Sequence, residues 1–275
     1  MRDNPVNKKA IQYSRGMCLA LHLDLAALSL ALGDAACRFD ADLLPSCDSS
    51  NAVLLARAEA GAPTGTVVIA ETQTAGRGRR GRAWLSAPGD SLTFSLLWRF
   101  VPGTTPAGLS LAVGLAVATA LEKVGAGGTA LKWPNDLLRD GKKLGGILVE
   151  LVPGTMHAAV IGIGLNLHLP AAMPADLREQ SAALDISVDP NRLLAALLLE
   201  LRATLDTFAH HGFAALRNAW QVHHAFENAP VRLLSDFAPS REGICRGVAV
   251  DGALLFEVDG QVERILSGEI SLRPR

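Results

Sequence analysis

The chain has 275 residues, of which 49% are hydrophobic, 19% charged and 5% aromatic, a composition that excludes disorder as its main state and allows one large or two modest domains. Lysine and arginine number 26 against 27 aspartates and glutamates, which gives a net charge of −1. A nearly neutral chain has no overall attraction to nucleic acid or anionic lipid, so any binding of polyanions must be local.

The first part of the chain predicts short helices and strands separated by loops. Residues 1–45 predict a helix near 16–32 and a strand near 38–44, and we interpret them as an N-terminal helical extension. The following segments predict helices at 51–60 and 106–124. They also predict strands at 66–71, 91–100, 146–151 and 158–165, and a short strand that leads into the block beginning at Lys132.

The last third changes from helical to β patterns. Leucine-rich helices are expected at 190–209 and 213–225. Short alternating strands follow at 231–235, 243–250, 253–258 and 261–267, with Asp-Gly turns between them. Strands and helices interleave without regular βαβ alternation, so we predict an α+β fold. Its mixed sheet, flanked by helices, would occupy residues 46–228, and a small β-barrel would occupy 229–275.

Cysteine usage and the apolar segments favour a cytoplasmic location. The four cysteines form no CxxC pair and have no histidine at metal-ligand spacing, so no metal site and no disulfide framework is indicated. His22 and Asp24 interrupt the apolar stretch Met17–Leu32, which is not typical of a secretory signal. Prolines break the start of the uncharged stretch Phe100–Leu121 and leave a helix too short to cross a bilayer.

An arginine- and glycine-rich loop follows the strand at 66–71. Gly76-Arg77-Gly78-Arg79-Arg80-Gly81 has the spacing of a dinucleotide-binding fingerprint, but the next predicted element is a strand where that fingerprint opens a helix. Four of the six residues at 77–82 are arginines, whose planar forks bind carboxylate and phosphate. We interpret the loop as an anion clamp, and a solvated basic loop is the alternative that this segment alone leaves open.

Two further polar blocks lie downstream. Lys132-Trp133-Pro134-Asn135-Asp136 and the pair Lys142-Lys143 flank a predicted turn, where the Asn and Asp could order the loop or a Mg²⁺ ion. Gly162-Ile163-Gly164-Leu165-Asn166 ends a strand with two glycines and one amide, which suits close contact with a flat ring. A surface turn and an ordinary strand end are the alternatives. A P-loop is excluded, because no G-x-x-x-x-G-K-[ST] occurs.

These blocks occur together and in one order, and in this combination the sequence resembles the biotin protein ligases, also called biotin-[acetyl-CoA-carboxylase] ligases. The resemblance spans residues 48–273 and is most specific in the Arg/Gly loop and the Lys-Trp-Pro-Asn-Asp block. The supporting blocks are Asp48-Ser49-Ser50-Asn51, Glu71 to Ala75, Trp84, Lys143 to Glu150, Gly162 to Asn166 and Gly268 to Arg273. Ser50, Thr74 and Ala83 depart from the common Thr, Gln and Lys of the family.

The resemblance implies a class II synthetase-like biotin/lipoyl ligase catalytic domain followed by an SH3-like barrel. It implies that the protein activates biotin with ATP as biotinoyl-AMP and transfers the acyl group to one lysine of a biotin carboxyl carrier protein, a subunit of acetyl-CoA carboxylase. Biotin and ATP would be substrates, and Mg²⁺ would bridge the phosphates mostly through water.

The resemblance also implies roles for individual residues. Lys143 and Arg77 are predicted to be catalytic. The residues predicted to bind biotin are Ser49, Ser50, Asn51, Gln73, Gly76, Arg77, Gly78, Arg79, Lys143, Gly145 and Gly146. The residues predicted to bind ATP are Arg77, Arg79, Arg80, Arg82, Trp84, Lys132, Asn135, Lys143, Gly164 and Asn166, with Glu269 and Arg273 supporting the ATP side. No residue is predicted to hold a metal.

Several alternatives remain. Bifunctional members of the family carry an N-terminal DNA-binding winged helix for which this chain has no room, so we expect a monofunctional ligase without nucleic-acid or membrane partners. A homodimer is left open. A lipoate-protein ligase is the nearest rival, since it shares the scaffold and the adenylation chemistry. A nucleic-acid-binding regulator that uses the arginine loop is a more distant one, and the C-terminal barrel could be an interaction module.

Overall fold

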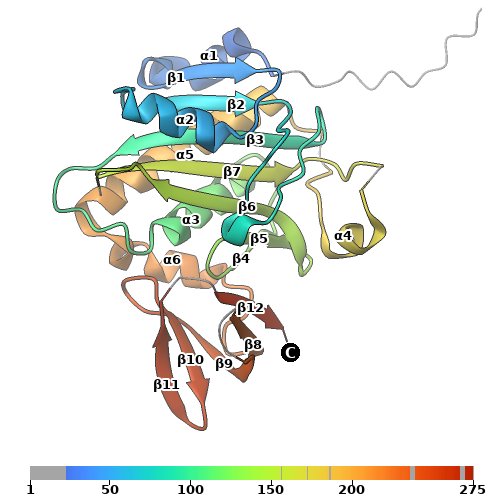
Figure 1. The fold of residues 1–275 in the computed structure, drawn as a ribbon, viewed down its shortest axis with the longest axis vertical. Coiled ribbons are helices and arrows are strands. Elements are labelled where there is room, and N and C mark those ends of the chain that lie inside the picture. The colour runs from blue at the N-terminus through green and yellow to red at the C-terminus, as the bar shows by residue number, and fades with distance from the viewer. Residues whose placement is uncertain are drawn as a thin grey trace, which may run out of the picture.

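A computed structural model describes residues 23–155, 157–171, 173–185, 187–235, 239–266 and 270–274 of the chain. Figure 1 shows a layered body with a small β unit at one end. The helices are α1 (Leu25–Leu32), α2 (Ser50–Glu59), α3 (Leu109–Lys123), α4 (Ala175–Gln180), α5 (Pro190–His211) and α6 (Arg217–Val222). The strands are β1 (Asp40–Leu44), β2 (Thr66–Ala70), β3 (Ser91–Arg99), β4 (Ala130–Lys132), β5 (Asp136–Arg139), β6 (Lys142–Leu151), β7 (Ala158–Asn166), β8 (Pro230–Ser235), β9 (Arg241–Val248), β10 (Leu254–Val258), β11 (Gln261–Ile265) and β12 (Ile270–Pro274).

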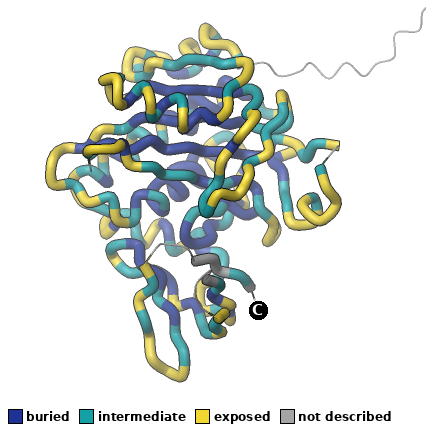
Figure 2. Tube along the Cα trace, in the orientation of Figure 1, coloured by how far each residue is buried: buried dark blue, intermediate teal, exposed yellow. Residues whose placement is uncertain are grey.

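A mixed seven-stranded sheet in the order β1-β2-β3-β7-β6-β5-β4 forms the centre of the molecule. Only β1 and β2 pair in parallel, and the other neighbours are antiparallel. Helices α3 and α5 lie behind the sheet in Figure 1, and α2 lies in front of it. Figure 2 shows the strands buried between these layers. The predicted α+β architecture, a mixed sheet flanked by helices, is confirmed.

The period of two residues along β3 and β7 gives this sheet two different faces. Apolar side chains of β3 (Leu92, Phe94 and Leu96) and β7 (Ile161, Ile163 and Leu165) belong to the core shared with α3 and α5. The residues between them are small or polar and point to the α2 side. They are Thr93 and Ser95 on β3 and Gly162, Gly164 and Asn166 on β7. The sheet therefore presents a ready floor for a site on one face only.

A tight turn between β5 and β6 fixes the position of Lys143. The predicted strand began at 146 and so left Lys142 and Lys143 outside it. Instead, Asp140 and Gly141 both have positive φ, 51° and 75°, as a two-residue hairpin turn requires. Strand β6 consequently begins at Lys142 and pairs with β5 from its first residue. Lys143 thus lies within a strand, on a backbone that the sheet holds rigid.

The C-terminal part forms a five-stranded antiparallel sheet in the order β11-β10-β9-β8-β12, which agrees with the predicted SH3-like unit. Strand β12 was not predicted as an element. Buried side chains of this sheet, among them Cys245 and Phe256, belong to the same core cluster as the main sheet. The Trp133 indole donates to the carbonyl of Gly252 at 3.0 Å. The small sheet is therefore packed firmly against the main sheet and its helices.

Other predicted elements are shifted or incomplete. The first part of the helix predicted at 16–32 lies outside the described residues, and its end is α1. Residues 23–45 do not stand apart, because β1 pairs with β2 and Leu28 of α1 is buried in the main core. The predicted division of the chain at residue 45 stays a prediction. Strand β5 and helix α4 were not predicted. Within the described ranges, no helix has both the length and the apolar character needed to span a bilayer.

The buried leucines of α5 should carry much of the stability. Leu201 is fully buried, whereas Leu199 on the same helix is 36% exposed. We expect Leu201→Ala to lower the free energy of unfolding by about 2 to 5 kcal/mol, because it leaves a cavity in a packed core. Leu199→Ala is the matched control and should change it by less than about 0.5 kcal/mol. Urea unfolding measures both, and equal effects would contradict this packing.

His224 lies at the junction of the two sheets. Its Nε2 is 3.7 Å from Cys245 Sγ, its ring centroid is 4.7 Å from that of Trp220, and its buried Nδ1 finds no hydrogen-bond partner among the described residues. Burial lowers the pKa of His224 to about 4, against a smaller opposing effect of Glu227. The folded protein therefore keeps this imidazole neutral where the unfolded chain, with a pKa of about 6.5, already binds a proton.

A pH-dependent loss of stability follows. The contribution of neutral His224 is complete above pH ~6.5 and disappears as the pH falls toward 4, since the unfolded state then binds more protons. We expect the free energy of unfolding to fall by on the order of 3 kcal/mol over this interval. In His224→Phe, which keeps a ring beside Trp220, this component should be missing. Urea titrations at a series of pH values test this, and identical pH profiles for the two proteins would refute it.

Candidate functional site

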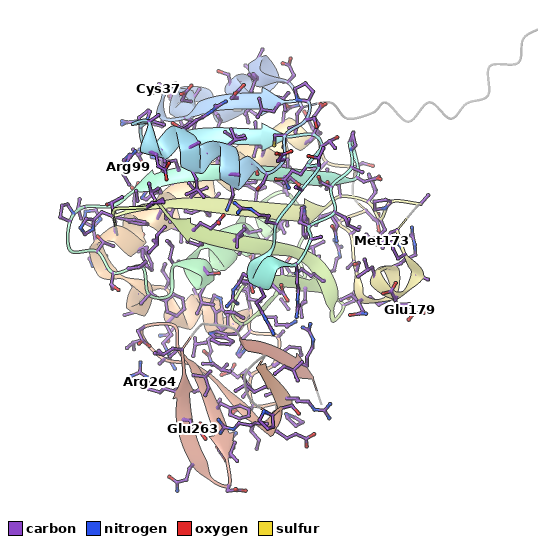
Figure 3. The ribbon with its side chains drawn as sticks, viewed as in Figure 1. Cys37, Arg99, Met173, Glu179, Glu263 and Arg264 are labelled. Carbon is purple, nitrogen blue, oxygen red and sulfur yellow. The ribbon has the colours of Figure 1, made fainter. Side chains whose placement is uncertain are left out.

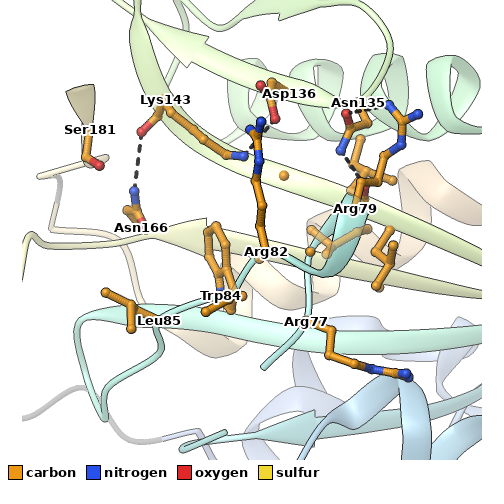
Figure 4. Close-up of a pocket in the computed structure, with 18 of the residues that line it drawn as sticks. Arg77, Arg79, Arg82, Trp84, Leu85, Asn135, Asp136, Lys143, Asn166 and Ser181 are labelled. Atoms are coloured by element: carbon orange, nitrogen blue, oxygen red, sulfur yellow. Dashed lines mark hydrogen bonds and ion pairs between the residues drawn. The ribbon is translucent and has the colours of Figure 1, made fainter. Parts of the chain in front are cut away.

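A cavity of about 520 Å³ opens on the face of the sheet that carries the small and polar residues. This volume is within the range typical of small-molecule sites. Its walls come from α2, the Arg/Gly loop, strands β3 to β7, α4 and β12, and Figure 4 shows part of the lining. Many predicted site residues line it: Ser49, Ser50, Asn51, Gln73, Arg77, Gly78, Arg79, Arg80, Arg82, Trp84, Lys132, Asn135, Lys143, Gly146, Gly164, Asn166 and Arg273.

One end of the cavity holds a cluster of one carboxylate and two lysines. Lys143 Nζ lies 2.7 Å from Asp136 Oδ1, and Lys132 Nζ lies 3.0 Å from Oδ2. Burial by itself would raise the pKa of Asp136, but its attraction to the two ammonium groups outweighs burial and lowers the pKa to about 2. Burial lowers the pKa of Lys132, and Asp136 opposes that change. The carboxylate thus stays ionised and holds both cations in place.

The two lysines differ in their access to the cavity. The side chain of Lys132 is 8% exposed, whereas that of Lys143 is 42% exposed. Lys143 can therefore meet a bound anion directly while Asp136 still orients it. Arg273, from β12 of the small sheet, lines the same cavity and lies close enough to Lys132 to lower its pKa. The C-terminal sheet thus adds a cation to this end.

The other end is lined by neutral polar groups on α2 and β3. The backbone N–H and the hydroxyl of Ser50 both donate to Gln73 Oε1, at 2.7 and 3.1 Å. Ser95 Oγ lies 2.6 Å from Asn51 Oδ1 and 2.8 Å from Ser50 Oγ. Asn51 Nδ2 donates to Glu150 Oε2 at 2.7 Å and to the carbonyl of Leu148 at 3.2 Å. This network fixes the orientation of each amide and hydroxyl before a ligand binds.

The Arg/Gly loop forms a short hairpin over the cavity. The N–H of Gly78 donates to the Arg82 carbonyl at 2.7 Å, and the N–H of Trp84 donates to the Gly76 carbonyl at 2.8 Å. A 3₁₀ turn at Arg79–Gly81 forms the tip, where Arg80 adopts a φ of 61°. The N–H groups at the neck are thus used to hold the hairpin together.

The loop arginines point in different directions. Arg79 Nη1 donates to Asn135 Oδ1 at 3.2 Å, and burial lowers the pKa of this guanidinium. Arg82 points toward the Lys143–Asp136 pair in Figure 4. Arg77 turns away from that pair, and its Nη2 lies 3.5 Å from both carboxylate oxygens of Glu150. Arg77 and Lys143 therefore line one cavity, but the side chain of Arg77 is engaged on the opposite wall.

Glycine at 164 makes room for a flat ring. A Cβ at Gly164 would lie 2.5 Å from ring atoms of Trp84, and the indole N–H donates to Thr93 Oγ1 at 3.3 Å. The indole thus lies directly on the strand backbone. Asn166 lines the cavity as well, but its Nδ2 donates to the carbonyls of Lys143 and Ala182 and so holds the segment after α4 against the sheet.

Two predicted residues that the structure describes are not among the residues that line the cavity. Gly76 is required at the neck of the loop, where a Cβ would lie 2.5 Å from the Trp84 carbonyl oxygen. Gly145 is required between strands, where a Cβ would lie 2.5 Å from the Gly164 carbonyl oxygen. Both therefore support the shape of the site. Glu269 lies outside the described residues.

Several residues in or beside the cavity were not among the predicted site residues. Asp136 belongs to a recognised block, but nothing in its spacing indicated that it holds two lysines. Ser95 and Glu150 look like ordinary strand residues, and only their register reveals the polar network. Met173 and Glu179, labelled in Figure 3, line the cavity from the α4 region. No periodic signal could have identified that short helix.

The arrangement combines two chemistries in one cavity. Fixed cations at one end suit phosphate and carboxylate groups, which repel each other unless positive charge lies between them. Neutral donors and acceptors at the other end suit a polar ring. Within the described part of the chain, no group of three or more His, Cys, Asp or Glu residues could hold a metal ion.

Comparison with known proteins agrees with this geometry. The profile of the Biotin/lipoate A/B protein ligase family matches residues 43–166. The chain is 42% identical to the bifunctional ligase/repressor BirA of Escherichia coli, over 84% of this chain and 73% of that protein. It is 35% identical to the biotin–[acetyl-CoA-carboxylase] ligase of Mycobacterium tuberculosis, over 83% of this chain and 87% of that protein.

A solved structure gives the same result. The biotin protein ligase of Aquifex aeolicus in complex with biotin and ATP superposes with a TM-score of 0.76 and 29% identity, over 86% of this chain and 99% of that one. Similarity at this level extends along most of both chains in each comparison, so this chain belongs to the biotin protein ligases of the biotin/lipoate A/B protein ligase family.

Proposed function

We propose that this protein is an ATP-dependent ligase that activates biotin as biotinoyl-AMP and transfers it to a lysine of a biotin carboxyl carrier protein. The observation that carries the proposal is the division of one cavity into a cationic end around Lys143 and a neutral polar end around Ser50 and Gln73. The names of the relatives, which are biotin ligases, support the same choice.

In the first step, a carboxylate oxygen of biotin attacks the α-phosphorus of ATP. A C–O–P anhydride forms, the bond to the β-phosphate oxygen breaks, and pyrophosphate leaves with that electron pair. Both reactants are anions, so positive charge fixed beforehand stabilises the approach and the developing pentavalent phosphorus. We assign this role to Lys143, with Lys132 and Arg79 on the phosphate side. Arg77, which the sequence analysis also predicted to be catalytic, stays a prediction in that role.

In the second step, the neutral amine of the carrier lysine attacks the acyl carbon. An amide bond forms, the acyl–phosphate bond breaks, and AMP leaves while the amine releases a proton. Asp136 is not proposed as the base for that proton, because a carboxylate with a pKa of about 2 is a weak base and both of its oxygens are occupied by lysines. Its role is to position the lysines.

The polar end favours biotin over lipoate. A ureido ring has two N–H donors and one carbonyl acceptor, and these need complementary partners when buried. Gln73 and the hydroxyl groups of Ser49 and Ser50 supply such partners, whereas the dithiolane ring of lipoate has no groups that would use them. We therefore propose that these residues surround the ureido ring and that Trp84 packs on the adenosine side near Gly164.

We propose Mg²⁺ only as an ion bound to the ATP phosphates and not as an ion held by the protein. Each oxygen of the partly buried Asp136 carboxylate already binds a lysine, and Glu150 is engaged by Asn51 and Arg77. These residues do not fit a metal held by the protein, so no step above depends on one. The carrier protein as the acceptor and the cytoplasmic location belong to the same proposal, while monofunctionality and a homodimer stay predictions.

A direct assay tests the function. We expect pyrophosphate release that requires both biotin and ATP, followed by transfer of radiolabelled biotin to a purified carrier domain. Calorimetry should detect binding of biotin and none of lipoate. Release of pyrophosphate with lipoate but not with biotin would assign the protein to the rival class.

Lys143 should be required for adenylation. Lys143→Met keeps the length of the side chain but removes its charge, so we expect pyrophosphate release to slow by about 10²- to 10³-fold while the protein stays folded. Lys123→Met is the control, because Lys123 pairs with Glu200 on the helices behind the sheet and should not affect the rate. Stopped-flow measurement of a single turnover gives the rate, and near-normal release would remove Lys143 from the mechanism.

Substitutions of Ser95 and Thr93 should distinguish the roles of the two ends of the cavity. The two residues lie on the same face of β3, but Ser95 contacts Asn51 and Thr93 contacts Trp84. Ser95→Ala leaves Asn51 Oδ1 without the hydroxyl 2.6 Å away, and we expect the KM for biotin to rise by about tenfold with little change for ATP. Thr93→Ala removes the acceptor of the Trp84 indole and should instead raise the KM for ATP. Steady-state kinetics with each substrate varied checks this, and the same pattern in both variants would contradict the division.

A further inference from the structure

Glu150 is the one carboxylate, among the described residues, that contacts both the polar floor of the cavity and the loop above it. It lies near the end of β6, where it pairs with Val160 of β7. The even-numbered residues Gly146, Leu148 and Glu150 alternate onto the same face of the strand, and the first two line the cavity. The side chain of Glu150 is 28% exposed, so it is open to the loop but partly protected from solvent.

On the floor, Glu150 fixes Asn51. The two N–H bonds of the Asn51 amide are both used, one to Glu150 Oε2 at 2.7 Å and one to the Leu148 carbonyl at 3.2 Å. Its oxygen accepts from Ser95 at 2.6 Å. Asn51 therefore has no N–H left for a ligand, although a second lone pair of its oxygen stays free to accept. Glu150 and the Leu148 carbonyl together determine which way this amide faces.

In the loop, the same carboxylate meets Arg77. The distance of 3.5 Å from Nη2 to both oxygens, with 46% of the arginine side chain exposed, describes a solvent-accessible ion pair. Such pairs contribute little to stability, but surface loops open at a low free-energy cost, so a small contribution is enough to favour the closed form. The side chain of Arg77 points away from Lys143 in Figure 4, so its charge is directed to Glu150 and not to the cationic end.

We propose that Glu150 is a positioning residue that fastens the Arg/Gly loop, through Arg77, to the Asn51 amide at the floor of the biotin end. Loop closure and the orientation of the polar floor then depend on one shared carboxylate. Arg77 acts through this contact as a latch and does not act on the phosphates. The effect on biotin binding rests on the proposed function, whereas the effect on the loop does not.

The chemistry of the side chains allows the two contacts to be separated. Glu150→Gln keeps a carbonyl oxygen for Asn51 but removes the negative charge that attracts Arg77. We expect trypsin to cleave the loop of the unliganded variant, at Arg79, Arg80 or Arg82, about two- to fivefold faster. Loss of an exposed ion pair shifts the equilibrium toward the open loop by about this factor, and the cleavage rate follows the open population. The KM for biotin should rise by a similar factor with kcat unchanged.

A double-mutant cycle tests the latch. Arg77→Gln should reproduce both effects of Glu150→Gln, and the double variant should show no larger effect than either single one. Arg77→Lys should restore part of the protection, and 1 M salt should remove most of the difference between variants and wild type. Glu257→Gln is the matched control, because it breaks a similarly exposed ion pair, to Arg246 at 2.6 Å, in the distant C-terminal sheet.

Two results would overturn the proposal. The first is unchanged loop cleavage in Glu150→Gln. The second is a loss of kcat of more than tenfold in Arg77→Gln that Glu150→Gln does not share, since this would place Arg77 on the phosphates. Failure of the proposed function is a separate observation, namely a wild-type protein that releases no pyrophosphate with biotin and ATP, and the cleavage experiment remains valid in that case.

Discussion

The arrangement of the site depends on the ion cluster around Asp136. Two ammonium groups would repel each other in a partly buried site, and a single carboxylate between them removes that cost. Because each oxygen holds one lysine, the cluster fixes the position of both cations and not only their charge. A site organised in this way needs little rearrangement when a phosphate arrives, which is the property that electrostatic catalysis requires.

All three residues of this cluster lie on strands. Asp136 begins β5 and Lys143 is the second residue of β6, so one hairpin with a two-residue turn brings the pair together. Lys132 reaches the same carboxylate from β4. Short connections between antiparallel strands leave the backbone little freedom, and the lysine heads therefore converge without a mobile loop. The Arg/Gly loop, which lies outside the strands, supplies a further wall of the site.

Glycines on β7 determine what can approach the floor of the site. Gly162 faces Asn51 and Gly164 faces the indole of Trp84, and a Cβ at either position would overlap them. Their alternation with Ile161, Ile163 and Leu165 lets one strand support a dense core on one face and a ligand site on the other. The loop hairpin and the neutral polar end of the cavity thus both pack on glycines of a single strand.

The sequence by itself determined the α+β class, most helices and central strands, and the set of blocks whose residues line the cavity, because hydrophobic periodicity and specific motifs are local properties. It misplaced the start of β6, since both Gly141-Lys142 and Asp140-Gly141 are plausible turns and only the pairing with β5 selects one. It left Ser95 and Glu150 unassigned, and its prediction that Arg77 is catalytic stays a prediction. Which side chains share a carboxylate or an amide is decided by strand register and by the path of the loop, and these are properties of the assembled sheet.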